Sequence, residues 1–194
     1  AEGKLVNRAA LPKKADEIVP AGPLELVKCT GSRNTDVCGL TQLRHNYDLD
    51  TLFGDYYGYR SGLNPLITVH LREIVRKAIS ISVPCDGDSI LDIGSNDGTL
   101  LSYYLKGKFN LVGIDPTIKK FQKYYPSNIY TIEDFFSLKR IRKEFSKEKF
   151  KIITGIAVFY DLKDPLSFLK GIASLLDNRG ICILEQSYLS LMIK

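Results

Sequence analysis

Several features that mark other protein classes are scarce or missing in this 194-residue sequence. Its four cysteines are scattered, without the dense spacing of a disulfide-stabilised secreted scaffold. The longest uncharged apolar run, at 152–160, is far shorter than the ~20 residues that a membrane-spanning helix needs. The N-terminal lysines are followed by no apolar block of the kind found in secretory signals. We therefore expect a cytosolic protein that does not enter a membrane.

Length and composition limit the number of domains that the chain can form. Apolar residues make up 44% of the chain and charged residues 25%, which is ordinary for a folded soluble protein. A chain of this length buries one good core and a small appendage, so we expect one α/β domain plus an extension. The formal net charge of +5 mildly favours anionic partners, such as phosphorylated small molecules or nucleic acid, but does not choose between them.

The first third of the chain differs from the rest. Residues 1–28 are rich in proline, alanine and lysine, which predicts an extended lead-in rather than a core element. Two short apolar stretches within 26–43 flank a polar insert and predict two small strands joined by a loop. We place a boundary near Leu63, with an N-terminal extension at 1–62 and the main domain at 63–194.

The main domain alternates between helix and strand patterns. Asn64 followed by Pro65 is a good helix start, and apolar residues then recur along one helical face. We expect strands at 90–93, 111–114, near 129, at 152–158 and 181–185, with helices starting at 98 and 116 and spanning 135–145 and 165–176. This βαβ alternation predicts an α/β fold, a Rossmann-like parallel sheet with flanking helices.

Polar residues follow the expected strands where ligands bind in an open parallel sheet, beyond the carboxyl ends. Asp92 ends the first strand and is followed by a glycine turn, Asp115 ends the second, Asp134 follows the third and Tyr160 follows the fourth. A carboxylate after the second strand suits a ribose diol, because it accepts two hydrogen bonds from adjacent hydroxyls. The pattern indicates a nucleoside-containing ligand.

The glycine turn itself favours one class of nucleoside cofactor. Nicotinamide dinucleotides prefer Gly-x-Gly-x-x-Gly, whereas this chain has Gly94-Ser95-Asn96-Asp97-Gly98. A pyrophosphate would meet Asp92 and Asp97 unfavourably, and a cationic sulfonium with its amino group would be attracted. The charges favour S-adenosylmethionine, and an NAD-binding domain is the alternative.

A resemblance to a known family rests on three segments, 89–101, Gly113-Ile114-Asp115-Pro116 and Glu133-Asp134-Phe135-Phe136. They resemble class I S-adenosylmethionine-dependent methyltransferases. Within that class the chain is most similar, from residue 24 onward, to deoxysugar C-methyltransferases that act on nucleotide-linked keto sugars. The narrower match rests on Leu26-Val27-Lys28-Cys29, Cys38-Gly39-Leu40-Thr41-Gln42-Leu43, Tyr59-Arg60-Ser61-Gly62 and Glu185-Gln186-Ser187-Tyr188-Leu189.

The resemblance implies roles for individual residues. It assigns Asp92 and Gly94 to the methionine moiety, Asp115 to the ribose, Asp134 and Phe135 to the adenine, and Tyr160 to the cleft floor. Ser95, Asn96 and Gly98 of the glycine turn are further candidate cofactor-binding residues. The segment that contains Tyr59 folds over the cofactor in that family, which makes Tyr59 the candidate catalytic residue. Carbon methylation also needs a base that makes an enolate-like carbon. The residues of this chain do not identify that base.

The chain departs from the family in two places. The family carries an N-terminal zinc module with two cysteine pairs, and Cys29 and Cys38 match only one of them. Whether Cys29 and Cys38 bind zinc therefore stays open, since two thiolates leave the ion under-coordinated. The family also continues past Met192 with the last strands and a sugar-binding domain. We expect a fragment truncated at both ends, a shortened relative, or a cofactor-binding half that needs a partner.

Simpler interpretations stay open for several of these residues. Asp115 and Asp134 are each explained as helix caps, and the glycine turn as a bend without a ligand. We expect His70 to be a partly buried structural histidine. The basic residues of 139–151 fit a solvated helix face, so an RNA or protein substrate is the less favoured alternative. A non-catalytic cofactor-binding module is the second functional alternative to a small-molecule methyltransferase.

Overall fold

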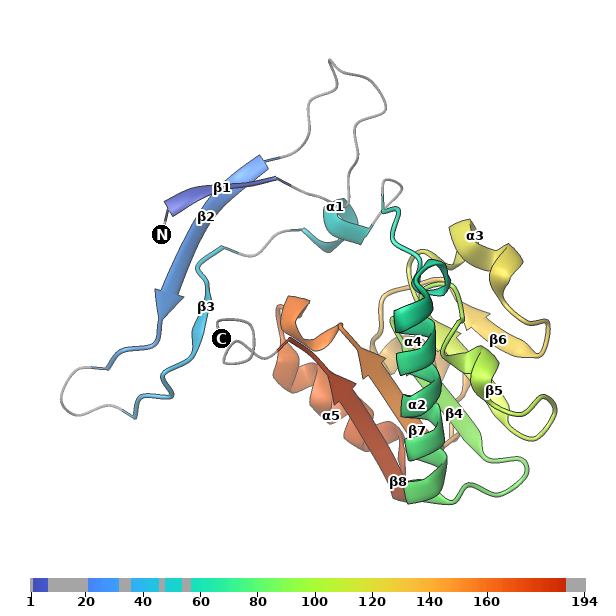
Figure 1. Ribbon diagram of the computed structural model, residues 1–194. Coiled ribbons are helices and arrows are strands. Elements are labelled where there is room, and N and C mark those ends of the chain that lie inside the picture. The colour runs from blue at the N-terminus through green and yellow to red at the C-terminus, as the bar shows by residue number, and fades with distance from the viewer. Residues whose placement is uncertain (1, 7–20, 32–35, 46–47, 54–56, 188–194) are drawn as a thin grey trace. The chain divides into compact units, whose positions relative to one another are not determined.

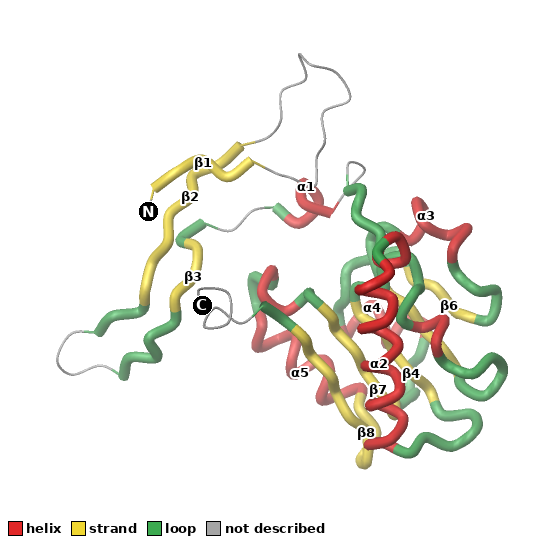
Figure 2. The backbone as a smooth tube through the Cα atoms, in the orientation of Figure 1, coloured by secondary structure: helices red, strands yellow, loops and turns green. Residues whose placement is uncertain are grey.

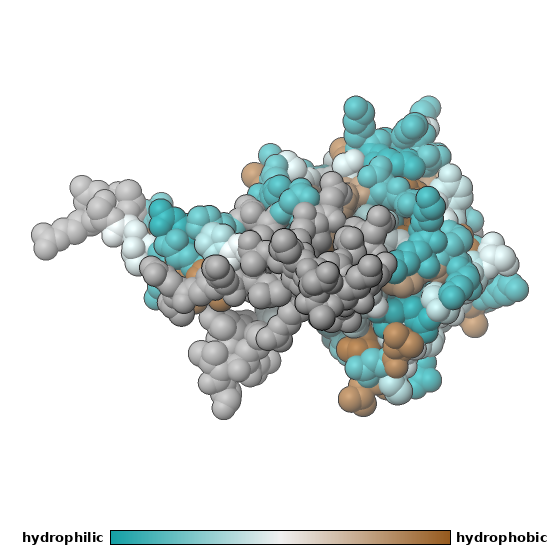
Figure 3. Space-filling view, turned by 90° about the horizontal axis from the view of Figure 1, so that it is seen from above, coloured by the Kyte–Doolittle hydropathy of each residue, from teal (hydrophilic) through white to brown (hydrophobic). Residues whose placement is uncertain are grey.

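The computed structural model describes residues 2–6, 21–31, 36–45, 48–53 and 57–187 (Figure 1). The chain divides into two compact units, Ala1–Tyr59 and Arg60–Lys194. Among the described residues no helix is long and apolar enough to cross a membrane. Hydrophilic residues predominate on the described surface that is visible in Figure 3.

The first unit contains a small antiparallel sheet. Strand β2 (Ala21–Lys28) lies between β1 (Glu2–Val6) and β3 (Thr41–Leu43), and a short helix α1 (Leu49–Phe53) follows. The two strands expected within 26–43 are confirmed. The lead-in was expected to be extended, and this is confirmed for β1, whose backbone pairs with β2 from Glu2↔Glu25 to Val6↔Ala21. The rest of the lead-in, at 7–20, lies outside the described residues.

The second unit contains a five-stranded parallel sheet in the order β6-β5-β4-β7-β8. The strands are β4 (Ser89–Ile93), β5 (Asn110–Ile114), β6 (Ile129–Ile132), β7 (Phe150–Ile156) and β8 (Leu176–Glu185). Chain order runs outward from β4 through β5 to β6 on one side and then resumes at β7 on the other. The strand order therefore reverses between β4 and β7, and ligands of open α/β sheets bind beyond the carboxyl ends at such a point.

Helices cover both faces of this sheet (Figure 2). Helix α2 (Pro65–Ser82) starts as expected, because the Asn64 side chain accepts a hydrogen bond from the Leu66 amide. Its buried face packs with Ile90 and Ile152 in one apolar cluster. Helices α4 (Leu138–Glu144) and α5 (Pro165–Leu175) pack with Leu91 and Ile153 in a second cluster. Successive strand residues point to opposite faces, which explains why Ile90 and Leu91 join different clusters.

Three helices differ from the expectation. The helix expected from Gly98 is a series of turns with only a short 3₁₀ segment, η2 (Leu101–Tyr103). The helix expected from Pro116 is divided between α3 (Ile118–Phe121) and η3 (Gln122–Tyr124). Helix α4 begins after Ser137, whose side chain accepts a hydrogen bond from the Arg140 amide and so caps it. The parallel α/β sheet itself is confirmed.

Candidate cofactor site and active site

The turn that leaves β4 has an unusual backbone. Gly94, Asn96 and Gly98 have φ angles of 72°, 50° and 76°, so alternate residues occupy the left-handed region. A Cβ atom on Gly94 would lie 2.5 Å from Val158 Cγ2, and one on Gly98 would lie 2.7 Å from the Tyr125 ring. Glycine is therefore required at both positions. We call residues 94–98 the glycine loop.

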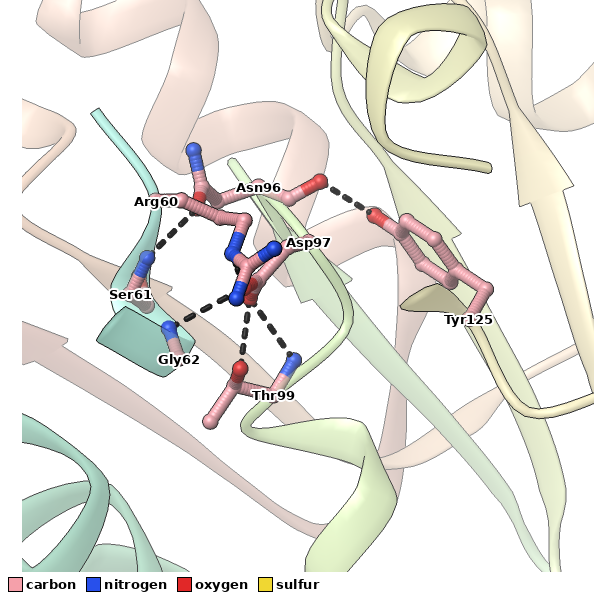
Figure 4. A network of polar contacts seen from close by, with 7 residues as sticks. All are labelled: Arg60, Ser61, Gly62, Asn96, Asp97, Thr99 and Tyr125. Carbon is pink, nitrogen blue, oxygen red and sulfur yellow. Dashed lines mark hydrogen bonds and ion pairs between the residues drawn. The ribbon is translucent and has the colours of Figure 1, made fainter. Parts of the chain in front are cut away.

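Asn96 is held in place by three hydrogen bonds, of which Figure 4 shows those with Ser61 and Tyr125. Its amide donates to Asp115 Oδ2 at 2.9 Å, its carbonyl accepts from the Tyr125 hydroxyl at 2.9 Å, and its Oδ1 accepts from the Ser61 amide at 2.9 Å. These bonds stabilise a left-handed conformation that costs a non-glycine residue about 1–2 kcal/mol. The glycine loop is thus preorganised by contacts from the residues that follow β5 and η3 and from the segment before α2.

Asp97 joins the same segment to the loop. Its Oδ2 accepts from the Gly62 amide at 3.0 Å and lies 3.2 Å from Arg60 Nε, while its Oδ1 accepts from the amide and hydroxyl of Thr99. The Arg60 guanidinium stacks on the Tyr124 ring at 3.6 Å from its centroid. Both side chains of the ion pair are largely buried, which strengthens their attraction. The tetrapeptide that contains Arg60 carried the resemblance, but the sequence assigned Arg60 no role.

Asp92 is buried inside the sheet rather than displayed at its rim. Only 3% of its surface is exposed, and it accepts a hydrogen bond from the Thr154 hydroxyl. Burial raises the pKa of Asp92 to about 7, and the neighbouring charge of Asp115 adds to the increase. Burial and the charge of Asp92 also raise the pKa of Tyr104, whose hydroxyl has no hydrogen-bond partner among the described residues. Protonated and ionised Asp92 therefore coexist near neutral pH.

Asp115 joins the glycine loop to the turn before α3. Its Oδ1 accepts from the amide and hydroxyl of Thr117, and its Oδ2 accepts from the Asn96 amide. The alternative that Asp115 caps the next helix is wrong, because α3 begins at Ile118 and Thr117 is its N-cap residue. A carboxylate has about four acceptor positions, so Oδ2 retains capacity for a ligand hydroxyl. The residue is 8% exposed. Its assignment to a ribose stays a prediction.

The electrostatic argument for the cofactor needs correction. Repulsion of a pyrophosphate by Asp97 was expected, but Arg60 compensates that charge. Asp134 is likewise paired, with Arg140 Nε at 3.1 Å. Asp92 is only partly ionised near neutral pH. Asp92 and Asp97 therefore do not present two uncompensated charges to a pyrophosphate, and the cofactor is inferred from the loop and from similar proteins.

The other predicted cofactor residues lie at the same edge of the sheet, with different surroundings. Ser95 is 4% exposed and shares a 2.8 Å hydrogen bond with the Tyr125 hydroxyl, so it belongs to the internal network. Asp134 and Phe135 follow β6, and Asp134 Oδ1 accepts from the Phe135 amide. Tyr160 is 57% exposed in η4 (Phe159–Asp161), directly beyond β7. Their contacts to a ligand stay predictions.

The remaining candidates lie in the first unit. Tyr59 is exposed, and its ring meets that of Tyr57 edge-on. The backbone and thiol of Cys38 hydrogen-bond to Cys29 and lower the pKa of that thiol, so the two cysteines lie side by side. Among the described residues no group of three or more histidine, cysteine, aspartate and glutamate side chains is arranged to hold a metal ion. A catalytic role for Tyr59 and zinc at the cysteines stay predictions.

His70 was expected to be partly buried, and this is wrong. Its side chain is 49% exposed on α2, where Nε2 lies 2.8 Å and 2.7 Å from the two carboxylate oxygens of Glu185. Glu185 is the last residue of β8, so the pair lies at the carboxyl edge of the sheet. The position of His70 beside the apolar face of the predicted helix did not indicate that it pairs with Glu185, which lies 115 residues further along the chain.

Comparison with known proteins identifies the family. A model described as a methyltransferase domain matches residues 67–191, which include every strand of the parallel sheet. The chain belongs to this methyltransferase domain family. The chain is 27% identical over 174 residues to the C-methyltransferase NovU of Streptomyces niveus, covering 89% of this chain and 40% of that protein. It therefore spans about two fifths of the length of this curated relative.

Solved structures agree in fold. The plantazolicin methyltransferase BpumL, in complex with a pentazolic desmethylPZN analog and SAH, has a TM-score of 0.54 at 18% identity, over 67% of this chain and 51% of that one. The same enzyme with a triazolic analog and SAH has a TM-score of 0.51 at 18% identity, over 64% and 48%. Such low identity shows the fold alone. The predicted class I S-adenosylmethionine-dependent methyltransferase domain is confirmed in family and fold.

Proposed function

We propose that this chain transfers the methyl group of S-adenosylmethionine to a carbon atom of a small molecule, with nucleotide-linked keto-deoxysugars as the acceptor class. The observation that carries the proposal is the preorganised glycine loop, which lies where the strand order reverses in a methyltransferase domain. Likeness to a C-methyltransferase supports carbon as the atom methylated.

The loop and strand ends fit this cofactor. Alternating left-handed residues bring bare backbone to the ligand edge, where a methionine moiety would lie beside Gly94 and Asn96. Asp115 retains acceptor capacity for the ribose hydroxyls. Phe135 and Tyr160 offer aromatic surface at the same edge, for the adenine and the cleft floor. When bound, S-adenosylmethionine supplies an electrophilic methyl group, and the protein's contribution is mainly orientation and exclusion of water.

The basic residues after β6 argue against a nucleic-acid substrate. Arg140 pairs with Asp134 and Glu144, and Arg142 donates to the carbonyls of residues 145, 146, 148 and 174. Lys149 donates to the Ser174 carbonyl as well. These cations fasten α4, β7 and α5 together. A non-catalytic module remains the second candidate, because the chain spans only 40% of NovU.

Methyl transfer by the chain itself tests the proposal. The chain is incubated with S-adenosylmethionine carrying an isotopically labelled methyl group and a dTDP-linked 4-keto-6-deoxyhexose, and the sugar is analysed by mass spectrometry and NMR. The proposed function predicts one labelled methyl group on carbon. Binding of the cofactor without transfer to this acceptor would favour the non-catalytic module, and transfer to oxygen or to added RNA would exclude the proposed acceptor chemistry.

A further inference from the structure

The pair formed by His70 and Glu185 has the geometry of an oriented acid–base group. A carboxylate only accepts hydrogen bonds, so the bonds at 2.7 and 2.8 Å place the imidazole proton of neutral His70 on Nε2. The basic lone pair is then on Nδ1, to which no described residue donates a hydrogen bond. A histidine base that is oriented by a neighbouring carboxylate in this way is typical of general acid–base catalysis.

A groove of about 500 Å³ adjoins the pair. Helix α2 forms one wall with His70, Ile74 and Lys77, and the end of β8 forms the other with Cys182 and Glu185. Its volume lies within the range of small-molecule sites, about 300–1,000 Å³, and its walls mix apolar with hydrogen-bonding groups, as such sites do. The α2 wall also includes Glu73, which pairs with Arg76, so the groove offers the Lys77 cation and several hydrogen-bonding groups to a hydroxyl-rich ligand.

The sheet order separates this groove from the cofactor residues. Asp115 follows β5 on one side of β4, whereas β7 and β8 lie on the other side. Neighbouring strands are ~4.8 Å apart, so β8 lies about 10 Å from β4, roughly the span of one sugar ring with its substituents. With the adenosyl part over β5 and the sulfonium near β4, the methyl acceptor has room over β7 and β8. Glu185 ends the second of these strands.

We propose that His70, oriented by Glu185, is the base that deprotonates the methyl acceptor, and that the groove between α2 and β8 holds this acceptor. The inference rests on the proposed function and adds the residue and subsite that the function requires. The acceptor is a carbonyl compound with a hydrogen on the adjacent carbon, of which a nucleotide-linked keto-deoxyhexose is the class already argued.

The chemistry balances without a further reactant. The C–H bond next to the carbonyl breaks, the proton moves to Nδ1 of His70, and the electron pair passes into the enolate, while Glu185 stabilises the imidazolium through Nε2. The enolate carbon then forms the new C–C bond with the donated methyl, as the S–C bond breaks and its electron pair stays on sulfur. His70 returns its proton to water after the products leave.

Proton abstraction is measurable without methyl transfer. The full 194-residue chain is mixed with S-adenosylhomocysteine and dTDP-linked 4-keto-6-deoxyglucose in heavy water, and loss of the sugar's α-proton is followed by NMR. The proposal predicts enzyme-dependent exchange that falls by about 100-fold or more in His70→Gln, since general bases contribute about 10²–10⁴-fold. Glu185→Gln, which keeps a hydrogen-bond acceptor but no charge, should reduce exchange by about 10-fold or more.

A matched control is available because the chain has two histidines. His45 lies 3.5 Å from Glu25 in the first unit, so His45→Gln removes a comparable pair elsewhere and should exchange like the parent chain. Affinity for S-adenosylhomocysteine should stay within about twofold in all variants. Exchange by His70→Gln at the parent rate, or a parent chain that binds S-adenosylhomocysteine and exchanges no proton, overturns the dyad. A parent chain that does not bind S-adenosylhomocysteine instead refutes the proposed function.

Discussion

Among single residues, Asp92 makes the stability of the protein depend on pH. Its carboxyl group is 3% exposed, and burial raises its pKa from 3.8 to about 7. Because the folded-state pKa lies above the unfolded one, the contribution of this group to stability is fully present below about pH 4 and is lost as pH rises toward 7. At higher pH the folded protein must ionise a buried carboxyl group, and this lowers the free energy of unfolding.

Replacing Asp92 with asparagine should therefore stabilise the protein at alkaline pH. Asparagine is isosteric and accepts the Thr154 hydroxyl hydrogen bond, but it carries no charge to bury. We expect Asp92→Asn to raise the free energy of unfolding on the order of 1–4 kcal/mol at pH 8, with little difference at pH 4. Urea denaturation of both proteins at the two pH values measures this. A difference that is the same at both pH values would show that the Asp92 charge is not responsible.

Two glycines with the same backbone test the packing of the glycine loop. Gly98 and Gly107 have φ angles of 76° and 78°, but a Cβ on Gly98 meets the Tyr125 ring whereas one on Gly107 meets nothing within 4 Å. Gly107→Ala should cost about 1–2 kcal/mol of stability from backbone strain alone. Gly98→Ala should cost ~1–3 kcal/mol more, because the ring must move. Equal losses in urea denaturation would mean that Tyr125 yields without cost.

At this scale local signals were predictable and distant pairings were not. The Asn64 cap and the acids at strand ends follow from neighbouring residues, and both are present. The contact of Arg60 with Asp97 joins residues on separate elements, and nothing in either neighbourhood specifies the partner. The same holds for His70 and Glu185, which only the packing of α2 beside β8 brings together.

Among elements, the segment that precedes α2 acts as a brace for the glycine loop. It contributes two backbone amides and the Arg60 guanidinium, which bind Asn96 and Asp97. Arg60 is also fixed by its stack on Tyr124. A brace of this kind couples the start of α2 to the conformation of the loop.

A double-mutant cycle measures that coupling. Arg60→Met removes the charge and leaves Asp97 buried without its cation, which should cost about 3–5 kcal/mol of stability. Asp97→Asn in the same chain removes the unpaired charge, so the double variant should recover part of the loss. Free energies of unfolding of the four proteins give the coupling energy. Additive losses would show that the ion pair does not connect the two segments.

The helix expected at Gly98 shows why elements near the site were harder to predict. Its apolar spacing was suitable, but Gly98 is left-handed and the Thr99 amide and hydroxyl bind Asp97, so the backbone turns before a helix can form. By contrast, apolar periodicity decided the extent of α2 and α5, which are regular over their whole length. Local pattern fails here because the loop is shaped by contacts from other elements.

For the whole molecule, the order of strands matters more than any single motif. Alternating patterns predicted the parallel sheet, but only the pairing of β4 with both β5 and β7 locates the reversal of strand order. That reversal brings the glycine loop, Asp115 and the end of β8 to one edge. The first unit has its own antiparallel sheet and adjacent cysteines, and its role stays a prediction.

Binding of S-adenosylhomocysteine is the most direct test of the central claim, that the glycine loop at this reversal is built for an adenosyl sulfur cofactor. Isothermal titration calorimetry of the chain with S-adenosylhomocysteine, and separately with NAD, compares the two cofactor classes without need of an acceptor. The account predicts saturable binding of S-adenosylhomocysteine at one site, with no heat from NAD. Saturable binding of NAD, with no response to S-adenosylhomocysteine at about millimolar concentration, would contradict it.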